Sequence, residues 1–453
     1  MSGITVYEFE WVYPSGKGDC GTKEIPAVPT TVFDWLQLQC LRSSVQGETA
    51  WLRLGLRRGR VAIQFTNYVG VIRAPDGFQI EVLPKVGLAI GGGEVESRCL
   101  LIEMLRCLNG FRHIRTDSAN LAAARMPLLE VFISEFLQAV ARIVKHGLRG
   151  DYTAQQDNLF TLRGKLLVIQ NLRQNLCRAD RFYTEHDVFS TNRPENRLVH
   201  TALRCVLSIS TFQSNQQLAR ELCFVFADVP ESSQIANDFQ RVRLDRGMAY
   251  YADSLAWARL ILEDESPLTG SGKHSAPSLL FPMESVFEAF VAKHLARQLV
   301  SPLTLKLQAQ SHHLVRHKEQ NWFRLKPDLL VQELANDRIV LDTKWKLIDG
   351  IKANGTDKYG LSQSDFYQLY AYGQSYLSGE GDVVLIYPKT DNFKVALDVF
   401  DFPKATGLRL WVLPFCLKTK VLLVPANAPF AADLRSGTEA THSSVKFNVA
   451  RVQ

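Results

Sequence analysis

The strongest constraint on the fold is the order of hydrophobic patterns between residues 281 and 387. A helical pattern comes first, three strand patterns follow it, and a second helix and one more strand complete the series. The expected elements are Met283–Leu299, Leu303–Leu314, Trp322–Gln332, Ile339–Leu347, Ser364–Leu377 and Asp382–Tyr387. This order predicts an α/β domain in the last third of the sequence.

The rest of the chain predicts an α+β multidomain protein. A Pro75-Asp76-Gly77 turn joins two β-branched runs and indicates a β-rich N-terminal module. Apolar residues then recur at three and four positions, which favours a helical middle region. A stretch rich in Ser, Gly and Pro follows and predicts a linker. The expected segments are 1–120 (β-rich module), 121–262 (helical region), 263–278 (linker), 279–430 (α/β domain) and 431–453 (flexible tail).

Composition and charge exclude several classes of protein. The 453 residues include 52 Lys and Arg against 46 Asp and Glu, so nucleic acid is permitted as a partner but not required. No run of about 18 apolar residues occurs, and Glu8 and Glu10 interrupt any signal peptide. We therefore expect a cytoplasmic protein that does not enter a membrane. The eight cysteines form no Cys-x-x-Cys pair, which argues against a zinc knuckle.

The segment Gly270-Ser271-Gly272-Lys273 resembles a phosphate-binding loop only superficially. Pro267 stands where the first glycine is needed, and His274 stands where Ser or Thr should follow the lysine. No strand pattern precedes the segment. We expect the chain to have no nucleotide hydrolysis activity of its own.

The strand pattern at 339–345 contains Asp342-Thr343-Lys344, the one Asp/Glu-x-Lys triplet in the sequence. A strand places Asp342 and Lys344 on the same face. Pro327-Asp328 opens the preceding strand, and an antiparallel hairpin would bring Asp328 level with the triplet. Two carboxylates and a lysine suit Mg²⁺ and phosphodiester hydrolysis, and Mn²⁺ is expected to substitute. The alternative is a surface ion pair with Asp328 unrelated to it.

Two helices offer further candidates. Glu284 and Glu288 lie one turn apart before the strands, and we favour Glu288 as an additional metal ligand over a solvated acidic face. After the strands, Gln368 and Tyr372 are also one turn apart and could face the same site, although packing alone would explain Tyr372. His312, His313 and His317 alternate across a strand, so they are poorly placed to bind one metal ion.

Together these residues resemble the PD-(D/E)xK nuclease superfamily. The matching elements are Glu288, Pro327-Asp328, Asp342-Thr343-Lys344 and, as in its RecB-like branch, Gln368-x-x-x-Tyr372. A narrower resemblance to the McrC family rests on short motifs upstream of these residues. The motifs are Val69-Gly70-Val71-Ile72, Glu81-Val82-Leu83-Pro84-Lys85, Gly147-Leu148-Arg149-Gly150-Asp151-Tyr152, Leu162-Arg163-Gly164-Lys165 and Asn192-Arg193-Pro194-Glu195-Asn196-Arg197.

The resemblance implies a function as well as a fold. McrC proteins are nuclease subunits of modification-dependent restriction systems, which defend against phage together with McrB, an AAA+ GTPase hexamer that recognises methylated DNA. It implies a Mg²⁺-dependent DNA endonuclease with a PD-(D/E)xK domain, acting on duplex DNA that carries methylcytosine. The N-terminal module would dock on the motor and stimulate it, with Arg53–Arg60 and Tyr68–Val86 as candidate surfaces. The alternative is a non-enzymatic, DNA-binding activator of the motor.

Overall fold

The computed structural model describes residues 3–15, 26–46, 51–57, 59–89, 92–108, 126–262, 278–334, 336–353 and 355–435. The chain divides into two compact units. The arm unit is mainly Arg115–Leu279 with Val71–Gln79, and the sheet unit is Gly3–Gly70, Ile80–Ile114 and Leu280–Gln453. This grouping differs from the segments expected from sequence, whose boundaries stay a prediction. The expected linker (263–277) and most of the expected tail (436–453) lie outside the described residues.

The largest sheet of the sheet unit has the strand order β12-β15-β16-β17-β19-β18, with β20 paired to β19. β15 and β16 are antiparallel, whereas β16, β17 and β19 run parallel, so the sheet is mixed. Its strands are β12 (Leu303–Leu307), β15 (Leu329–Glu333), β16 (Asn336–Thr343), β17 (Gly381–Pro388), β18 (Phe400–Phe402), β19 (Ala405–Cys416) and β20 (Val421–Leu422).

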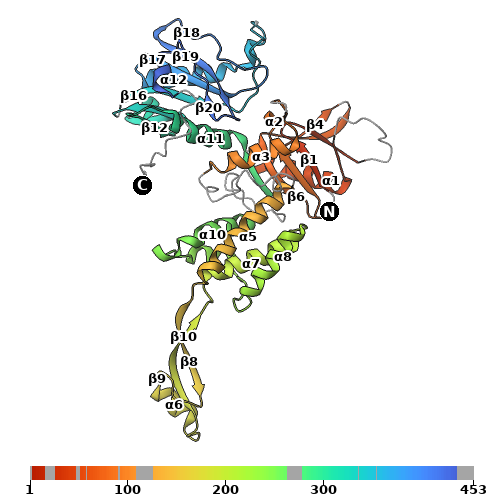
Figure 1. Ribbon diagram of the computed structural model, residues 1–453, viewed down its shortest axis with the longest axis vertical. Coiled ribbons are helices and arrows are strands. Elements are labelled where there is room, and N and C mark those ends of the chain that lie inside the picture. Colours follow the sequence, from red (N-terminus) through yellow and green to blue (C-terminus); the bar gives the residue numbers. More distant parts are fainter. Residues whose placement is uncertain are drawn as a thin grey trace. The chain divides into compact units, whose positions relative to one another are not determined.

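Two helices pack on this sheet, as Figure 1 shows. Helix α12 (Gln363–Tyr376) buries Leu369 against a core that includes Val340 and Val383. It packs closely on β19, because a Cβ atom at Gly373 would come within 2.6 Å of the Leu408 side chain. Helix α11 (Met283–Gln298) contacts β12 and β16. The helices and strands thus follow the order expected from sequence.

The structure also divides two of the expected strands. The expected strand at Leu303–Leu314 separates into β12 and β13 (His312–His317), and the one at Trp322–Gln332 separates into β14 (Gln320–Leu325) and β15. β13 and β14 pair with each other as a separate two-stranded sheet. A hairpin is therefore inserted between β12 and β15, which are neighbours in the large sheet.

The N-terminal part of the sheet unit is rich in strands, as expected. One four-stranded sheet has the order β3-β2-β5-β4 and another has the order β1-β7-β6-β11. The expected turn between β6 and β7 is present, with Gly77 at a φ of 86° and its backbone N–H donating to Ala74 at 2.9 Å. The elements are β1 (Gly3–Tyr7), β2 (Trp11–Pro14), β3 (Ala27–Val28), α1 (Thr30–Gln46), β4 (Leu52–Arg57), β5 (Arg60–Phe65), β6 (Tyr68–Arg73), β7 (Gln79–Leu83), α2 (Val86–Ala89), α3 (Glu94–Leu105) and β11 (Ser278–Pro282).

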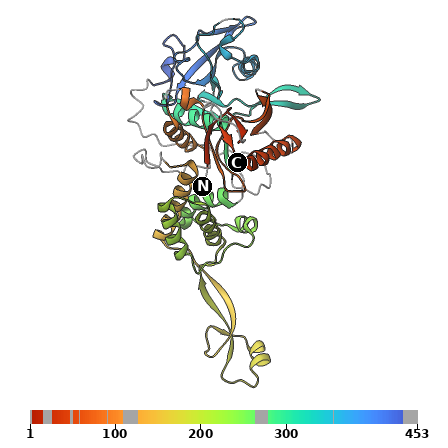
Figure 2. The ribbon, with the colours of Figure 1, turned by 90° about the vertical axis from the view of Figure 1, so that its right-hand side faces the viewer.

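The arm unit combines helices with a long β-ribbon. Strands β8 (Asp151–Leu159) and β10 (Phe182–Ser190) pair along their whole length and extend away from the helices, with β9 (Lys165–Leu166) and α6 (Val168–Asn175) at the far end (Figures 1 and 2). We call this extension the arm. The helices are α5 (Leu128–His146), α7 (Pro194–Ile209), α8 (Gln213–Val225), α9 (Ile235–Arg241) and α10 (Ala252–Leu262).

None of the described helices is both long enough and apolar enough to cross a membrane.

Candidate functional site

The centre of the candidate site is the pair formed by Asp342 and Lys344 at the end of β16. Asp342 is 1% exposed, and its Oδ2 atom lies 2.5 Å from the Nζ atom of Lys344. Apart from this ion pair, neither carboxylate oxygen of Asp342 has a hydrogen-bond partner among the described residues. A buried carboxylate usually has its oxygens satisfied, so Asp342 retains unused capacity to bind a ligand.

Asp328 stands beside this pair, as the hairpin predicted. Leu329 pairs with Leu341 across β15 and β16, so Asp328 lies one position further, at the level of Asp342. Its Oδ2 atom accepts two hydrogen bonds from Thr343, one from the backbone N–H and one from the hydroxyl, both at 2.8 Å. No hydrogen bond to Oδ1 is present in the described part of the chain. Thr343, which the sequence did not single out, therefore orients this carboxylate.

Helix α12 supplies Gln368 and Tyr372 to the same site. The Nζ atom of Lys344 donates to the Gln368 side-chain oxygen at 3.1 Å. The Gln368 amide nitrogen donates to the hydroxyl of Tyr372 at 2.8 Å, and that hydroxyl donates to the Lys326 carbonyl at 3.0 Å. The chain of contacts from Lys344 to Lys326 fixes the lysine in direction, and it shows that Tyr372 does more than fill the core.

Glu288 and Glu284 face different surroundings. The Glu288 carboxylate accepts a hydrogen bond from Gln308 at 3.0 Å, and the Gln308 backbone N–H donates to the Asp328 carbonyl at 2.8 Å. Glu284 is exposed, and its charge acts on Glu8 rather than on Asp328. The surroundings favour Glu288, although its role as a metal ligand stays a prediction. In the described ranges, no three His, Cys, Asp or Glu side chains gather closely enough to hold a metal ion unaided.

The electrostatics follow from burial and crowding of carboxylates. Burial, reinforced by the charge of Asp328, raises the pKa of Asp342 to about 7, although Lys344 opposes the shift. Burial also raises the pKa of Glu288, and Asp328 adds to it. Burial works to lower the pKa of the Lys344 ammonium, but the attraction of Asp342 outweighs it and the pKa is raised. The site therefore holds excess negative charge with one cation, and a further cation would be attracted to it.

Other candidates do not converge on one place. His312 packs edge-on against Tyr376, and His317 packs against Trp322, so the histidines are used in ring contacts. Arg57 lies over the Trp11 ring. These residues remain outside the carboxylate–lysine site.

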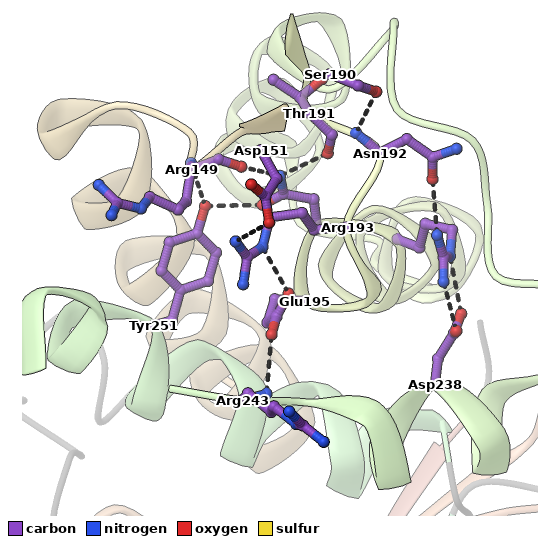
Figure 3. A network of polar contacts seen from close by, with 12 residues as sticks. Arg149, Asp151, Ser190, Thr191, Asn192, Arg193, Glu195, Asp238, Arg243 and Tyr251 are labelled. Atoms are coloured by element: carbon purple, nitrogen blue, oxygen red, sulfur yellow. Dashed lines mark hydrogen bonds and ion pairs between the residues drawn. The ribbon is translucent and has the colours of Figure 1, made fainter. Parts of the chain in front are cut away.

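A second polar constellation lies at the base of the arm (Figure 3). The Tyr251 hydroxyl accepts a hydrogen bond from the Arg149 N–H at 2.9 Å and donates to Asn196 at 2.7 Å. Arg193 pairs with Asp151 at 3.4 Å and with Glu195 at 3.2 Å. Two of the motifs quoted for the family resemblance, 147–152 and 192–197, therefore meet where the ribbon joins the helices. The third, Leu162-Arg163-Gly164-Lys165, lies in the outer part of the arm, between β8 and β9.

The fold and the site define an α+β protein with several sheets and a carboxylate–lysine site on its largest sheet. Residues 63–388 match the family model of the McrBC 5-methylcytosine restriction system component, and the chain belongs to this family. No curated protein matches the chain.

Two solved structures from Thermococcus gammatolerans are similar to this chain. One is a chain of the refined half-complex from the tetradecameric assembly of McrB AAA+ hexamers with bound McrC, with 20% identity and a TM-score of 0.66 over 95% of this chain and 97% of that chain. The other belongs to the cryo-EM structure of the McrBC complex, with 20% identity and a TM-score of 0.47 over 64% of this chain and 86% of that chain. At this identity, the first likeness shows a shared fold.

Proposed function

We propose that this chain is the DNA endonuclease subunit of a McrBC-like restriction complex and hydrolyses phosphodiester bonds in a PD-(D/E)xK-type site. The observation that carries the proposal is the buried carboxylate of Asp342, which is paired only with Lys344 among the described residues and lies level with Asp328. Membership of the McrBC family supports the restriction context.

The donor set fits a hard divalent cation. Asp342 has unsatisfied oxygens, and the Oδ1 atom of Asp328 is left over after Thr343 has bound Oδ2. Mg²⁺ usually takes one or two carboxylates and completes its coordination with water and substrate phosphates, so a cluster of three acids is not required. Asp328 and Asp342 would hold the ion, Glu288 would add a carboxylate, and Mn²⁺ is expected to substitute.

A bound divalent cation supplies polarisation of a phosphoryl oxygen and activation of water. The Lys344 ammonium neutralises the negative charge that develops on the phosphate. Gln368 accepts a hydrogen bond from this ammonium, and Tyr372 in turn holds Gln368, so both residues keep Lys344 in place. This arrangement costs little reorganisation when the phosphate arrives.

A McrB-like AAA+ GTPase hexamer that recognises modified DNA is the proposed partner. The similar structure contains McrB AAA+ hexamers with bound McrC. The sequence of the present chain has no functional phosphate-binding loop, so nucleotide turnover must come from another protein. In this division of labour, methylcytosine recognition belongs to the motor and cleavage belongs to this chain.

The arm offers a surface for this partner besides the expected N-terminal one. Its outer part exposes apolar side chains that a monomer normally buries. We define the arm-tip patch as Phe160, Leu162, Val168, Ile169, Leu172 and Leu176, each more than half exposed. An exposed apolar group of this kind at the end of an extension is typical of a protein contact.

The test is reconstitution with a McrB-like AAA+ protein on methylated and unmethylated duplex DNA. We expect Mg²⁺-dependent cleavage of methylated DNA, abolished by a chelator and by Lys344→Ala. A complex that binds DNA and turns over GTP but never cleaves would instead identify the chain as a non-enzymatic activator.

A further inference from the structure

The inserted hairpin β13–β14 is exposed along most of its length and differs from the rest of the sheet unit. It forms a two-stranded sheet of its own, and it is drawn in teal in Figure 2 as a projecting ribbon. Four large apolar side chains on it are 45% to 68% exposed: Leu314, Val315, Trp322 and Phe323. A two-stranded hairpin gains little stability alone, so exposed apolar groups on it call for a partner.

The charge of the hairpin indicates what kind of partner it fits. Between His312 and Lys326 the sequence contains four Lys and Arg residues and one acidic residue, Glu319. The exposed basic side chains are Arg316, Lys318, Arg324 and Lys326, and three histidines stand among them. Basic groups interleaved with exposed aromatic rings match the phosphates and base surfaces of nucleic acid.

The backbone of the hairpin is also unusual. Lys318 and Glu319 both have positive φ at the turn, and Phe323 has a φ of 54° within β14. A positive φ is uncommon for a bulky aromatic residue and is usually retained where it serves a function. It presents the Phe323 ring to solvent beside Trp322, at a ring distance of 6.4 Å.

The base of the hairpin is fixed to the carboxylate–lysine site. The Tyr376 hydroxyl lies within hydrogen-bond distance of the carbonyls of Ala309 and Leu325, at 3.2 and 3.0 Å. One turn earlier on α12, Tyr372 donates to the Lys326 carbonyl, two residues before Asp328, and accepts from Gln368. Any nucleic acid held by the hairpin is therefore positioned by the same helix that orients Lys344.

We propose that β13–β14 is a DNA-binding ribbon that holds duplex DNA against the site, with Arg316 and Lys318 on phosphates and Trp322 and Phe323 in a groove. The major groove of B-DNA admits a two-stranded β-ribbon of this kind. The identity of the partner as DNA rests on the proposed function, whereas the surface itself rests on the charge, exposure and anchoring of the hairpin.

The test is DNA binding by the full chain in the absence of divalent ions, so that no cleavage occurs. Fluorescence anisotropy with a labelled duplex compares the wild type with Arg316→Gln/Lys318→Gln and with Trp322→Ala/Phe323→Ala. Each double variant should weaken binding about tenfold. The charge variant should also lower the slope of log K against log salt by about 0.9 for each phosphate that it no longer neutralises. Arg316→Lys/Lys318→Arg should restore binding.

The matched control is Arg338→Gln/Lys394→Gln, which removes two exposed basic residues of the same unit, paired with Glu333 and Asp391. It should bind DNA like the wild type. The inference is overturned if both hairpin variants bind duplex DNA normally, if the wild type binds no duplex, or if the variants lose only the AAA+ partner or self-association. A wild type that binds through the hairpin but never cleaves with its motor would contradict the proposed function and leave this inference standing.

Discussion

The carboxylate of Glu8 accepts hydrogen bonds from the indole nitrogen of Trp345, at 2.8 Å to Oε1 and 3.0 Å to Oε2. Glu8 is 2% exposed, and its Oε1 atom also accepts from the Lys85 N–H at 2.9 Å. Trp345 directly follows Lys344 in the sequence and packs on Phe287, the neighbour of Glu288. A residue next to β1 therefore fixes the backbone beside the proposed catalytic lysine.

Glu8→Ala should destabilise the protein by about 2 to 4 kcal/mol, because it leaves the indole N–H of Trp345 and the N–H of Lys85 buried without acceptors. Urea unfolding followed by tryptophan fluorescence measures this destabilisation. Glu8→Gln keeps the shape and one acceptor and should cost less. An alanine variant that unfolds at the wild-type urea concentration would show that the contact contributes nothing.

The same carboxylate should make stability depend on pH. Burial raises the pKa of Glu8 to about 7, although the hydrogen bonds from Trp345 and Lys85 oppose the shift. Because the folded pKa lies above the unfolded value, the folded protein binds the proton more tightly, and stability falls as the pH rises through 7. Between pH 8 and pH 5 the wild type should gain about 2 to 3 kcal/mol relative to Glu8→Gln.

This comparison isolates Glu8. Asp342 also has a raised pKa, but it is present in both proteins and its contribution cancels. Parallel unfolding curves for wild type and Glu8→Gln across this pH range would mean that Glu8 is not the titrating group.

Asp342→Asn should abolish cleavage while leaving the free energy of unfolding at pH 8 unchanged or higher by about 1 kcal/mol. The raised pKa of Asp342 means that its charge is costly in the folded protein without a bound cation, and asparagine removes that charge. Cleavage assays and urea unfolding of the same preparation check both parts. A neighbouring strand provides the control, since Asp382 is a buried aspartate bound by Arg409 and Trp411. Asp382→Asn should lose stability but retain cleavage, and the reverse pattern would refute the assignment.

The local chemistry of the site was predictable from sequence because strand geometry is regular. A period of two residues places Asp342 and Lys344 together, and a hairpin brings Asp328 level with them, as the pairing of Leu329 with Leu341 shows. The orienting role of Thr343 was missed, because its side chain gives no signal beyond its place inside the triplet.

Long-range and solvated features were not predictable in the same way. Glu8 and Trp345 are 337 positions apart, and no local pattern connects them. The strands β8 and β10 have mostly exposed or half-buried residues on both faces, so the alternation that reveals a half-buried strand is absent. The hairpin β13–β14 was merged into its neighbours for the same reason, since both of its faces are polar or exposed.

The isolated chain should hydrolyse neither GTP nor ATP. Its Gly270–Lys273 segment lies outside the described residues, but its sequence lacks the first glycine and the hydroxyl residue after the lysine. Phosphate release by the purified, motor-free chain measures this. Turnover that disappears with Lys273→Ala would contradict the expectation, and turnover that persists would indicate a contaminating enzyme.

The docking surface for the AAA+ partner can be located with full-length variants. A fragment ending near residue 262 would lack β11, which pairs in the sheet with β6, and Trp345, which covers Glu8, so its failure to bind would be hard to interpret. Leu172→Asp/Leu176→Asp places charge in the arm-tip patch, where both side chains are exposed and the fold should tolerate the change. We expect the affinity for the partner to fall at least tenfold, because a charge cannot be buried in an apolar contact without a large cost.

The expected N-terminal surface is tested in the same binding assay with Arg53→Gln/Arg57→Gln, which changes two exposed arginines of β4. Phe224→Asp, at an exposed position of α8 outside both surfaces, serves as the control and should bind normally. Weakened binding by both double variants would show that the motor contacts both surfaces. Normal binding by the arm variant, with weakened binding by the arginine variant, would confine docking to the N-terminal strands and remove the arm tip from the interface.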